Sequence, residues 1–275
     1  MSTHSLLKNS HGGVFSHEYL VSQLFIMSAV SLAMLAVSST RPSMNELGGV
    51  FFLVNRSFEM SEVMYSKRLA SSITKIPMID LRGQSQTLKQ LLEETKQQKK
   101  NSCILIKEFP PSTITPGQVS AFIKKLKQSG FSPDAIVLDY LNLISAPYGD
   151  NSYERVKVVS EKVRALSYEF ECPIISATQI NRTGYGVDQP GLETISESTG
   201  LAATADAIFS IWQNDEDKDM GIVNLGIVKS RFGPNFGSTP LRIDYHTLTI
   251  SEDNIVSGTA ESLDFTRSLN QLVDT

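Results

Sequence analysis

The chain has 275 residues, of which 41% are hydrophobic, so it can bury the core of one large α/β domain or of two small ones. Its net charge of −4 excludes a broadly basic nucleic-acid-binding surface, but it allows a ring protein whose few basic loops line a channel. The only cysteines, Cys103 and Cys172, stand among apolar, strand-like residues. We therefore expect reduced, buried thiols and a cytoplasmic protein, which excludes a secreted disulfide scaffold.

Residues 1–47 are predicted to form an atypical leader with one apolar helix. The stretch Tyr19–Val37 carries no charge over nineteen residues, which is long enough to cross a bilayer. Its serines and Gln23 dilute the hydrophobicity, however, and no basic cluster precedes it. We therefore favour a buried helix or a poorly folded region over a membrane or signal segment. The three irregularly spaced histidines of this region predict no metal site.

From residue 50 onward, strands and helices alternate. The predicted elements in chain order are a strand at 50–54, a helix capped by Ser61, a polar helix near 87–100, a strand at 103–107, a helix near 117–129, a strand at 135–139, a helix near 152–170, a strand at 173–178, and strands near 206–212, 222–230 and 240–250. This alternation predicts an α/β fold, a mostly parallel sheet with helices on both faces. In the helix near 152–170, apolar residues recur at three- and four-residue steps and indicate a core face. The last strands, with a glycine-rich turn at Phe232–Gly237, predict an antiparallel extension.

Polar side chains follow three of the predicted strands. Asp139 comes directly after AIVL, and Gln179 comes after IISAT. Ligands bind beyond the carboxyl ends of strands in an open parallel sheet, so Asp139 is suited to hold magnesium through its water shell and Gln179 to sense a γ-phosphate. Glu59, just before the helix capped by Ser61, is placed to orient an attacking water as general base. Each of these residues, taken alone, also fits a helix cap or a turn.

Lys229 and Arg231 lie in the segment GIVKSRFGP, at the end of a predicted strand. Because one residue separates them, their side chains point the same way on an extended chain. Together they are suited to reach a phosphate on a neighbouring subunit. The alternative is a solvated strand end.

The segment Asn181–Ser198 is long, polar and rich in glycine. Loops of this length at the edge of a sheet usually bind something. Arg182 and the backbone amides near Gly184 and Gly186 suit a nucleic-acid backbone, and Tyr185 offers a face for base stacking. A surface loop without a ligand is the alternative.

Five segments together resemble the RecA-like C-terminal motor domain of DnaB-type replicative DNA helicases, with the T-even phage enzymes as the nearest likeness. They occur in the family's order over roughly residues 57–250 and read SFEMSEVMYSKRL, AIVLDYLNLI, ISATQINR, SESTGLAATADAIFSI and GIVKSRFGP. The resemblance divides the chain into the leader of residues 1–47, an incomplete motor domain at 48–255 and a tail at 256–275. It implies an ATP-dependent DNA helicase that acts on single-stranded DNA in replication.

The resemblance also implies a role for each polar residue singled out above. Glu59 corresponds to the catalytic glutamate, Asp139 to the magnesium-associated aspartate and Gln179 to the γ-phosphate sensor. Lys229 and Arg231 correspond to cations that act in trans on the ATP of the adjacent subunit in a hexameric ring. The loops after Asp139 and Gln179 would face single-stranded DNA. The implied cofactors are ATP and Mg²⁺, and the implied further partners are a primase and a helicase loader.

The sequence departs from the family at the phosphate-binding loop. It contains no G-x-x-x-x-G-K-[ST] segment, and before residue 48 its only glycines are Gly12 and Gly13. Two explanations fit: a truncated or frame-disrupted gene, which we favour because the later phosphate-facing residues remain, or a paralogue that has lost hydrolysis. Loss of the loop removes charge-assisted hydrogen bonds worth roughly 1.5–3 kcal/mol each, which predicts weak ATP binding and poor turnover.

Three other functions remain open at this point. The chain fits a non-hydrolysing structural or regulatory subunit that enters a RecA-like ring and lends Lys229 and Arg231 to active copies. It also fits a recombinase or circadian-type RecA relative, although the spacing in KSRFGP and the SFEM segment favour a helicase. A membrane-anchored protein is the third, and solubility of the intact chain without detergent would count against it.

Overall fold

The computed structural model describes residues 47–55, 62–98, 102–110, 113–139, 141, 144–146, 148–149, 151–178, 191, 199–231, 233 and 237–252. The apolar helix expected in the leader and the tail at 256–275 lie outside the described residues. Of the helices that are described, none is both long and apolar enough to span a bilayer.

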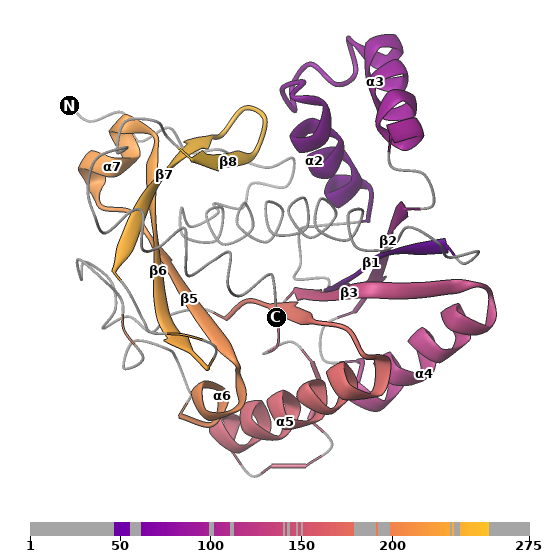
Figure 1. Ribbon diagram of the computed structural model, residues 1–275, viewed down its shortest axis with the longest axis vertical. Helices are drawn as coiled ribbons and strands as arrows, with labels where there is room; N and C mark the ends of the chain where they lie inside the picture. The colour runs from indigo at the N-terminus through magenta and orange to yellow at the C-terminus, as the bar shows by residue number, and fades with distance from the viewer. Residues whose placement is uncertain are drawn as a thin grey trace.

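The first half of the described chain forms a four-stranded parallel sheet (Figure 1). Its strands lie side by side in the order β2 (Ser102–Phe109), β1 (Leu47–Asn55), β3 (Phe131–Asp139) and β4 (Ile174–Ser176). The chain runs outward from β1 to β2, and it then crosses to the other side of β1 to form β3 and β4. Because crossovers between parallel strands are right-handed, this reversal of direction puts the connecting helices on opposite faces of the sheet.

Helices cover both faces of the parallel sheet, which confirms the predicted fold class (Figure 1). On one face lie α2 (Glu62–Thr74) and α3 (Ser85–Gln98), and on the other lie α4 (Pro116–Gln128) and α5 (Ser152–Phe170). The sequence did not predict two shorter helices, α6 (Thr199–Thr204) and α7 (Asp215–Met220). Each has six residues, which is too short to show a helical hydrophobic period.

Local sequence signals fix where the two long helices beneath the sheet begin. Thr115 and Gln118 form a reciprocal capping box at the start of α4, and Pro116 occupies the first turn, where its missing N–H costs no hydrogen bond. Asn151 caps α5 by accepting from the backbone N–H of Glu154 at 2.9 Å. These caps satisfy backbone donors that a helix start otherwise leaves unpaired.

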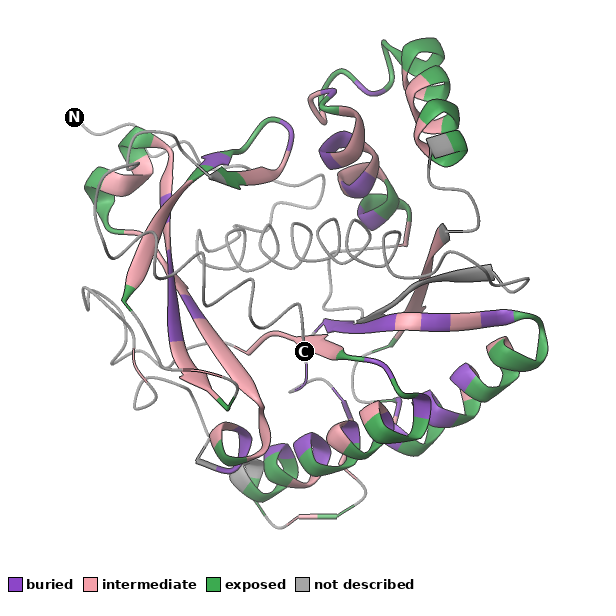
Figure 2. Cartoon of the chain, in the orientation of Figure 1, coloured by how far each residue is buried: buried purple, intermediate pink, exposed green. Residues whose placement is uncertain are grey.

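The main core lies between the parallel sheet and helices α4 and α5 (Figure 2). From β3, Ile136 and Leu138 are fully buried in it. The face of α5 that packs there is the one predicted from its spacing, and it consists of Val156, Val159, Val163, Leu166 and Phe170. Because side chains alternate across a strand, Asp139 lies on the opposite face from Ile136 and Leu138, the face that α2 covers.

The second half of the chain forms a four-stranded antiparallel sheet in chain order, as predicted: β5 (Ala207–Trp212), β6 (Ile222–Ser230), β7 (Ser238–Asp244) and β8 (Thr249–Glu252). The prediction of a single strand near 240–250 is wrong, because the chain turns between β7 and β8. The carboxylate of Asp244 stabilises this turn by accepting from the His246 N–H at 2.8 Å and from the Thr247 hydroxyl at 2.7 Å.

The two cysteines are free, as expected, but they are not equally buried. Cys172 lies in the main core, whereas Cys103 on β2 is only half-buried. Burial still raises the pKa of the Cys103 thiol, and the nearby Asp134 carboxylate raises it further. The expectation of two buried thiols is therefore correct for Cys172 alone.

Candidate functional site

The carboxyl edge of the parallel sheet is formed by the ends of β1, β3 and β4. Asp139 ends β3 and is 3% exposed. In the strand register, Val54 of β1 pairs with Asp139, and Ser176 of β4 pairs with Leu138. The Ser176 hydroxyl donates to the Leu138 carbonyl at 2.7 Å, which fastens β4 to β3 at this edge. The central strand thus presents a buried carboxylate where both neighbouring strands also end.

Tyr65 of α2 reaches the carboxylate at this edge. Its hydroxyl donates a hydrogen bond to Asp139 Oδ2, and the tyrosine is only 1% exposed. On α2, Tyr65 and Leu69 are one helical turn apart and both buried, so this side of the helix faces the sheet. A buried carboxylate needs such donors, because an unpaired charge away from water is costly.

The start of α2 is tied to the end of β2 by a pair of glutamates. The backbone N–H of Glu62 donates to Glu108 Oε2 at 3.1 Å, and the N–H of Glu108 donates to Glu62 Oε1 at 2.9 Å. Lys107 Nζ lies 3.2 Å from the same Glu62 oxygen. The Glu108 N–H, and to a smaller extent Lys107, lower the pKa of Glu62 against the opposing effect of burial. This end of α2 therefore has a fixed position beside the carboxyl edge.

The other residues predicted for the site lie outside the described residues. They are Glu59, Gln179, Arg182, Gly184, Tyr185 and Gly186. The strands that lead to Glu59 and Gln179 are nevertheless described, and they are β1 and β4, the two neighbours of β3. These two strands end beside Asp139, and the site roles of Glu59 and Gln179 stay predictions.

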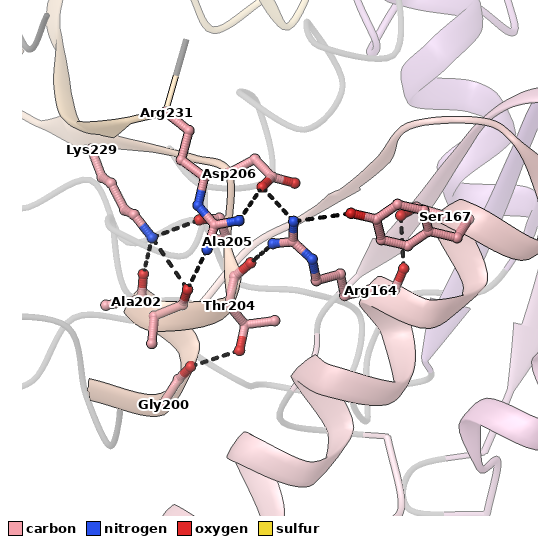
Figure 3. A network of polar contacts seen from close by, with 11 residues as sticks. Arg164, Ser167, Gly200, Ala202, Thr204, Ala205, Asp206, Lys229 and Arg231 are labelled. Carbon is pink, nitrogen blue, oxygen red and sulfur yellow. Dashed lines mark hydrogen bonds and ion pairs between the residues drawn. The ribbon is translucent and has the colours of Figure 1, made fainter. Parts of the chain in front are cut away.

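Lys229 and Arg231 come together at the carboxyl end of α6 (Figure 3). Lys229 Nζ donates to the carbonyls of Ala202, Ala203 and Ala205, with distances of 3.4 Å to Ala203 and 2.7 Å to Ala205. Arg231 Nη2 donates to the Ala203 carbonyl at 2.9 Å. The last carbonyls of a helix lack partners within the helix and carry partial negative charge, so cations stabilise them.

Asp206 is the carboxylate of this cluster. It directly precedes β5, and its backbone carbonyl accepts from the Arg231 N–H at 2.9 Å. Its side-chain Oδ1 lies 2.9 Å from Arg231 Nη1 and 2.8 Å from Arg164 Nη2. Arg164 comes from α5, and its Nη1 donates to the Thr204 carbonyl at the end of α6 (Figure 3). One carboxylate is therefore shared by two guanidinium groups from different elements.

The cation cluster of Arg164, Lys229 and Arg231 has more positive than negative charge. Among the described residues, three cations gather around the carboxylate of Asp206, and two of them, Arg164 and Arg231, pair with it. Burial lowers the pKa of Lys229 most, and repulsion by Arg231 and Arg164 lowers it further, while Asp206 opposes the shift. An anion that approached this cluster would be attracted to the uncompensated charge.

Sequence reasoning missed Tyr65, Arg164 and Asp206 as members of these two sites. Tyr65 was recognisable only as an aromatic residue on the sheet side of a predicted helix. Arg164 stands off the apolar stripe of α5, where a solvated charge is the usual interpretation. Asp206 is the first residue of the strand predicted near 206–212, a position where aspartate usually belongs to the preceding turn. All three depend on contacts between segments distant in sequence, which no local pattern encodes.

Among the described residues, no group of three or more histidine, cysteine, aspartate or glutamate side chains is arranged to bind a metal ion. Asp139 supplies a hard carboxylate oxygen of the kind that Mg²⁺ prefers. Mg²⁺ commonly keeps several waters and uses one or two carboxylates. The donors described at this edge therefore fit an ion held through its water shell rather than one enclosed by protein ligands.

The fold agrees with comparisons to known proteins. The family model described as DnaB-like helicase C terminal domain matches residues 27–251, so the chain belongs to this family. It is 25% identical over 185 residues to the DnaB-like replicative helicase of Enterobacteria phage T4, covering 64% of this chain and 39% of the relative. It is 30% identical over 211 residues to replicative DNA helicase DnaB of Buchnera aphidicola subsp. Baizongia pistaciae, covering 69% and 42%.

Solved structures show the same fold. A structure described as an ATPase domain superposes with a TM-score of 0.65 at 19% identity, covering 85% of this chain and 82% of that one. A DnaB-like replicative helicase studied for its interactions with primase also gives 0.65, at 17% identity, covering 84% of this chain and 56% of that one. In these curated relatives, the matches span 28–42% of the relative's length. The chain therefore belongs to the family of DnaB-like helicase C-terminal domains and shares the fold of these structures.

Proposed function

We propose that this chain acts as the motor domain of a replicative DNA helicase, which couples ATP hydrolysis to movement on single-stranded DNA. The observation that carries the proposal is the buried carboxylate of Asp139, at the carboxyl edge of a parallel sheet and between two strands that end beside it. This is the position at which open α/β sheets bind nucleotides. Family membership supports the same function.

ATP with Mg²⁺ is the proposed cofactor pair. Mg²⁺ neutralises charge on the phosphates when it is bound, and Asp139 is the residue suited to hold its water shell. Glu59 is proposed to orient the attacking water as general base, and Gln179 to sense the γ-phosphate. Since the sequence has no G-x-x-x-x-G-K-[ST] loop to cradle the phosphates, we expect this chain to bind ATP weakly by itself.

The proposed assembly is a hexameric ring around single-stranded DNA. Arg182, Gly184, Tyr185 and Gly186 are proposed to contact the DNA through backbone phosphates and base stacking. The cation cluster at α6 supports a role in trans, because its excess positive charge suits the ATP phosphates of an adjacent subunit. A primase and a helicase loader are proposed as further partners, and a structural neighbour is described with its primase interactions.

A second function, that of a non-hydrolysing subunit, is favoured by one observation. The chain keeps Lys229 and Arg231 in a cluster while its sequence lacks the phosphate-binding loop. Such a subunit would complete the sites of active copies without hydrolysing ATP itself. Co-assembly with a relative that has the loop, followed by native mass spectrometry, separates the two functions, because only the subunit function requires mixed rings.

The proposal is tested by binding of a non-hydrolysable ATP analogue to the full chain with and without Mg²⁺. We expect an affinity far below that of a relative with the phosphate-binding loop, and a further loss when Asp139→Asn removes the charge that holds the ion. Tight, magnesium-dependent binding would refute the expected effect of the missing loop. If neither the removal of Mg²⁺ nor the Asp139→Asn substitution changes the affinity, the proposed role of Asp139 is refuted.

A further inference from the structure

Arg164 and Arg231 compete for one oxygen atom of Asp206. Arg164 Nη2 lies 2.8 Å and Arg231 Nη1 2.9 Å from Oδ1, so neither guanidinium has the carboxylate to itself (Figure 3). A single negative charge shared between two cations compensates neither of them fully. The charge left on Arg231 therefore depends on Arg164, a residue on another element.

The two arginines differ in how firmly they are held. The side chain of Arg164 is 25% exposed, and besides Asp206 it bonds the Thr204 carbonyl and the Tyr168 hydroxyl, the latter at 3.3 Å. The side chain of Arg231 is 44% exposed and stands at the end of β6. Its other side-chain bond runs to the Ala203 carbonyl. Arg164 is thus the fixed member of the pair, and Arg231 is the member that can move.

Releasing Arg231 from Asp206 costs little. Ion pairs between half-exposed side chains contribute little to stability, because water screens the charges. If Arg231 leaves, Asp206 keeps its bond to Arg164, so no carboxylate is left without a cation. A polyphosphate offers Arg231 several charged oxygens, and the planar guanidinium can bind two of them at once. An incoming anion can therefore take Arg231 from its own chain.

We propose that Asp206 is a latch that holds Arg231 on its own chain. Arg164 is a positioning residue that weakens this latch, because it shares the charge of the Asp206 carboxylate. Arg231 is thereby available to the polyphosphate of a neighbouring copy. The latch deepens the proposed function, since the natural anion would be the nucleotide bound by the adjacent subunit. Arg164 and Asp206 thereby influence the activity of the ring, although neither residue contacts the nucleotide.

The latch is tested with the full chain and inorganic tripolyphosphate as the probe, by calorimetric titration at low ionic strength, where charge interactions are least screened. Arg231→Ala should weaken binding about tenfold, because a direct ligand is lost. Asp206→Asn should strengthen binding about three- to tenfold, because the competing carboxylate is gone. A gain in affinity cannot result from damage to the fold.

Arg164 provides the opposite test. Arg164→Met should weaken binding about threefold, because Asp206 then pairs with Arg231 alone, and Arg164→Lys should recover part of the loss because it keeps the charge. Lys162→Met is the matched control, since it removes one positive charge from an exposed position on the same helix. It should change the affinity by less than about 1.5-fold.

A double-variant cycle separates the latch from a mere change in net charge. The latch predicts that the gain from Asp206→Asn disappears in an Arg231→Ala background, because there is no longer an arginine to release. An equal gain in both backgrounds would overturn the latch and leave the proposed function intact. If the wild type and Arg231→Ala bind tripolyphosphate equally, the latch is overturned, because the Arg231 side chain then does not bind the anion. A further outcome is that the cycle gives the result that the latch predicts while Arg231→Ala leaves the ATPase rate of mixed rings unchanged. In that case the proposed function fails and the latch stands.

Discussion

Tyr65 illustrates how a residue without a predicted role holds in place a residue that has one, Asp139. Its hydroxyl donates to the buried Asp139 carboxylate from the opposite side of the sheet to the main core. Phenylalanine at this position keeps the ring but removes the donor. We predict that Tyr65→Phe lowers the free energy of unfolding by about 1–3 kcal/mol, measured by urea denaturation, because a buried carboxylate loses a hydrogen bond.

The control for this prediction is Tyr148→Phe, which removes a hydroxyl from a tyrosine that is 63% exposed. It should change the free energy of unfolding by less than about 0.5 kcal/mol. An unchanged stability in Tyr65→Phe would show that the bond to Asp139 contributes nothing in solution.

Glu62 predicts a pH dependence. The Glu108 N–H first, and Lys107 next, hold the folded-state pKa of Glu62 below its ordinary value of 4.5. A lowered pKa stabilises the folded chain above pH 4.5, and this contribution is lost as the pH falls through the lowered value. Since the side chain is 43% exposed, the contribution should be below about 1 kcal/mol. Glu62→Gln should therefore be less stable than the wild type at about pH 7 and should approach it near about pH 3, measured by urea denaturation. A difference that stays constant with pH would contradict this assignment.

At the scale of elements, the short helix α6 links the two sheets. It packs on α5, and the cations of α5 and β6 meet at its carboxyl end. The two helices approach closely at the buried Gly200, where an added Cβ would lie 2.8 Å from Lys157 Cβ and 2.9 Å from Lys157 Cγ. Real side chains do not approach so closely, so one helix would have to move.

We predict that Gly200→Ala lowers the free energy of unfolding by about 1–2 kcal/mol, although alanine favours helices, because overpacking exceeds the gain in helix propensity. It should also weaken tripolyphosphate binding, since displacement of α6 disturbs the carbonyls that hold Lys229 and Arg231. Gly117→Ala is the matched control in α4, where the nearest atom to an added Cβ is 3.9 Å away. The control should be neutral or stabilising, and equal effects of the two substitutions would contradict the packing argument.

At the scale of the whole molecule, the sequence predicted the sheets well, whereas the roles of the site residues stay predictions. Apolar runs ending in a polar residue located β3 and β4, and the spacing on α5 identified its core face, because both signals are periodic and local. The turn at Asp244 was missed because flanking strand-like residues conceal it. Arg164 and Asp206 were missed because their meeting depends on the packing of α5 against α6.

The proposed function predicts a ring in which each chain completes the neighbouring site. The most direct measurement of this account is the ATPase rate of mixed assemblies of this chain with a relative that has the phosphate-binding loop, comparing the wild type with Arg231→Ala and Lys162→Met. We predict that Arg231→Ala lowers the rate at least about tenfold at the shared interfaces, since a cation supplied in trans stabilises the transferring phosphoryl group, while Lys162→Met leaves it unchanged. Equal rates with the wild type and Arg231→Ala, in assemblies shown to contain both chains, would contradict it.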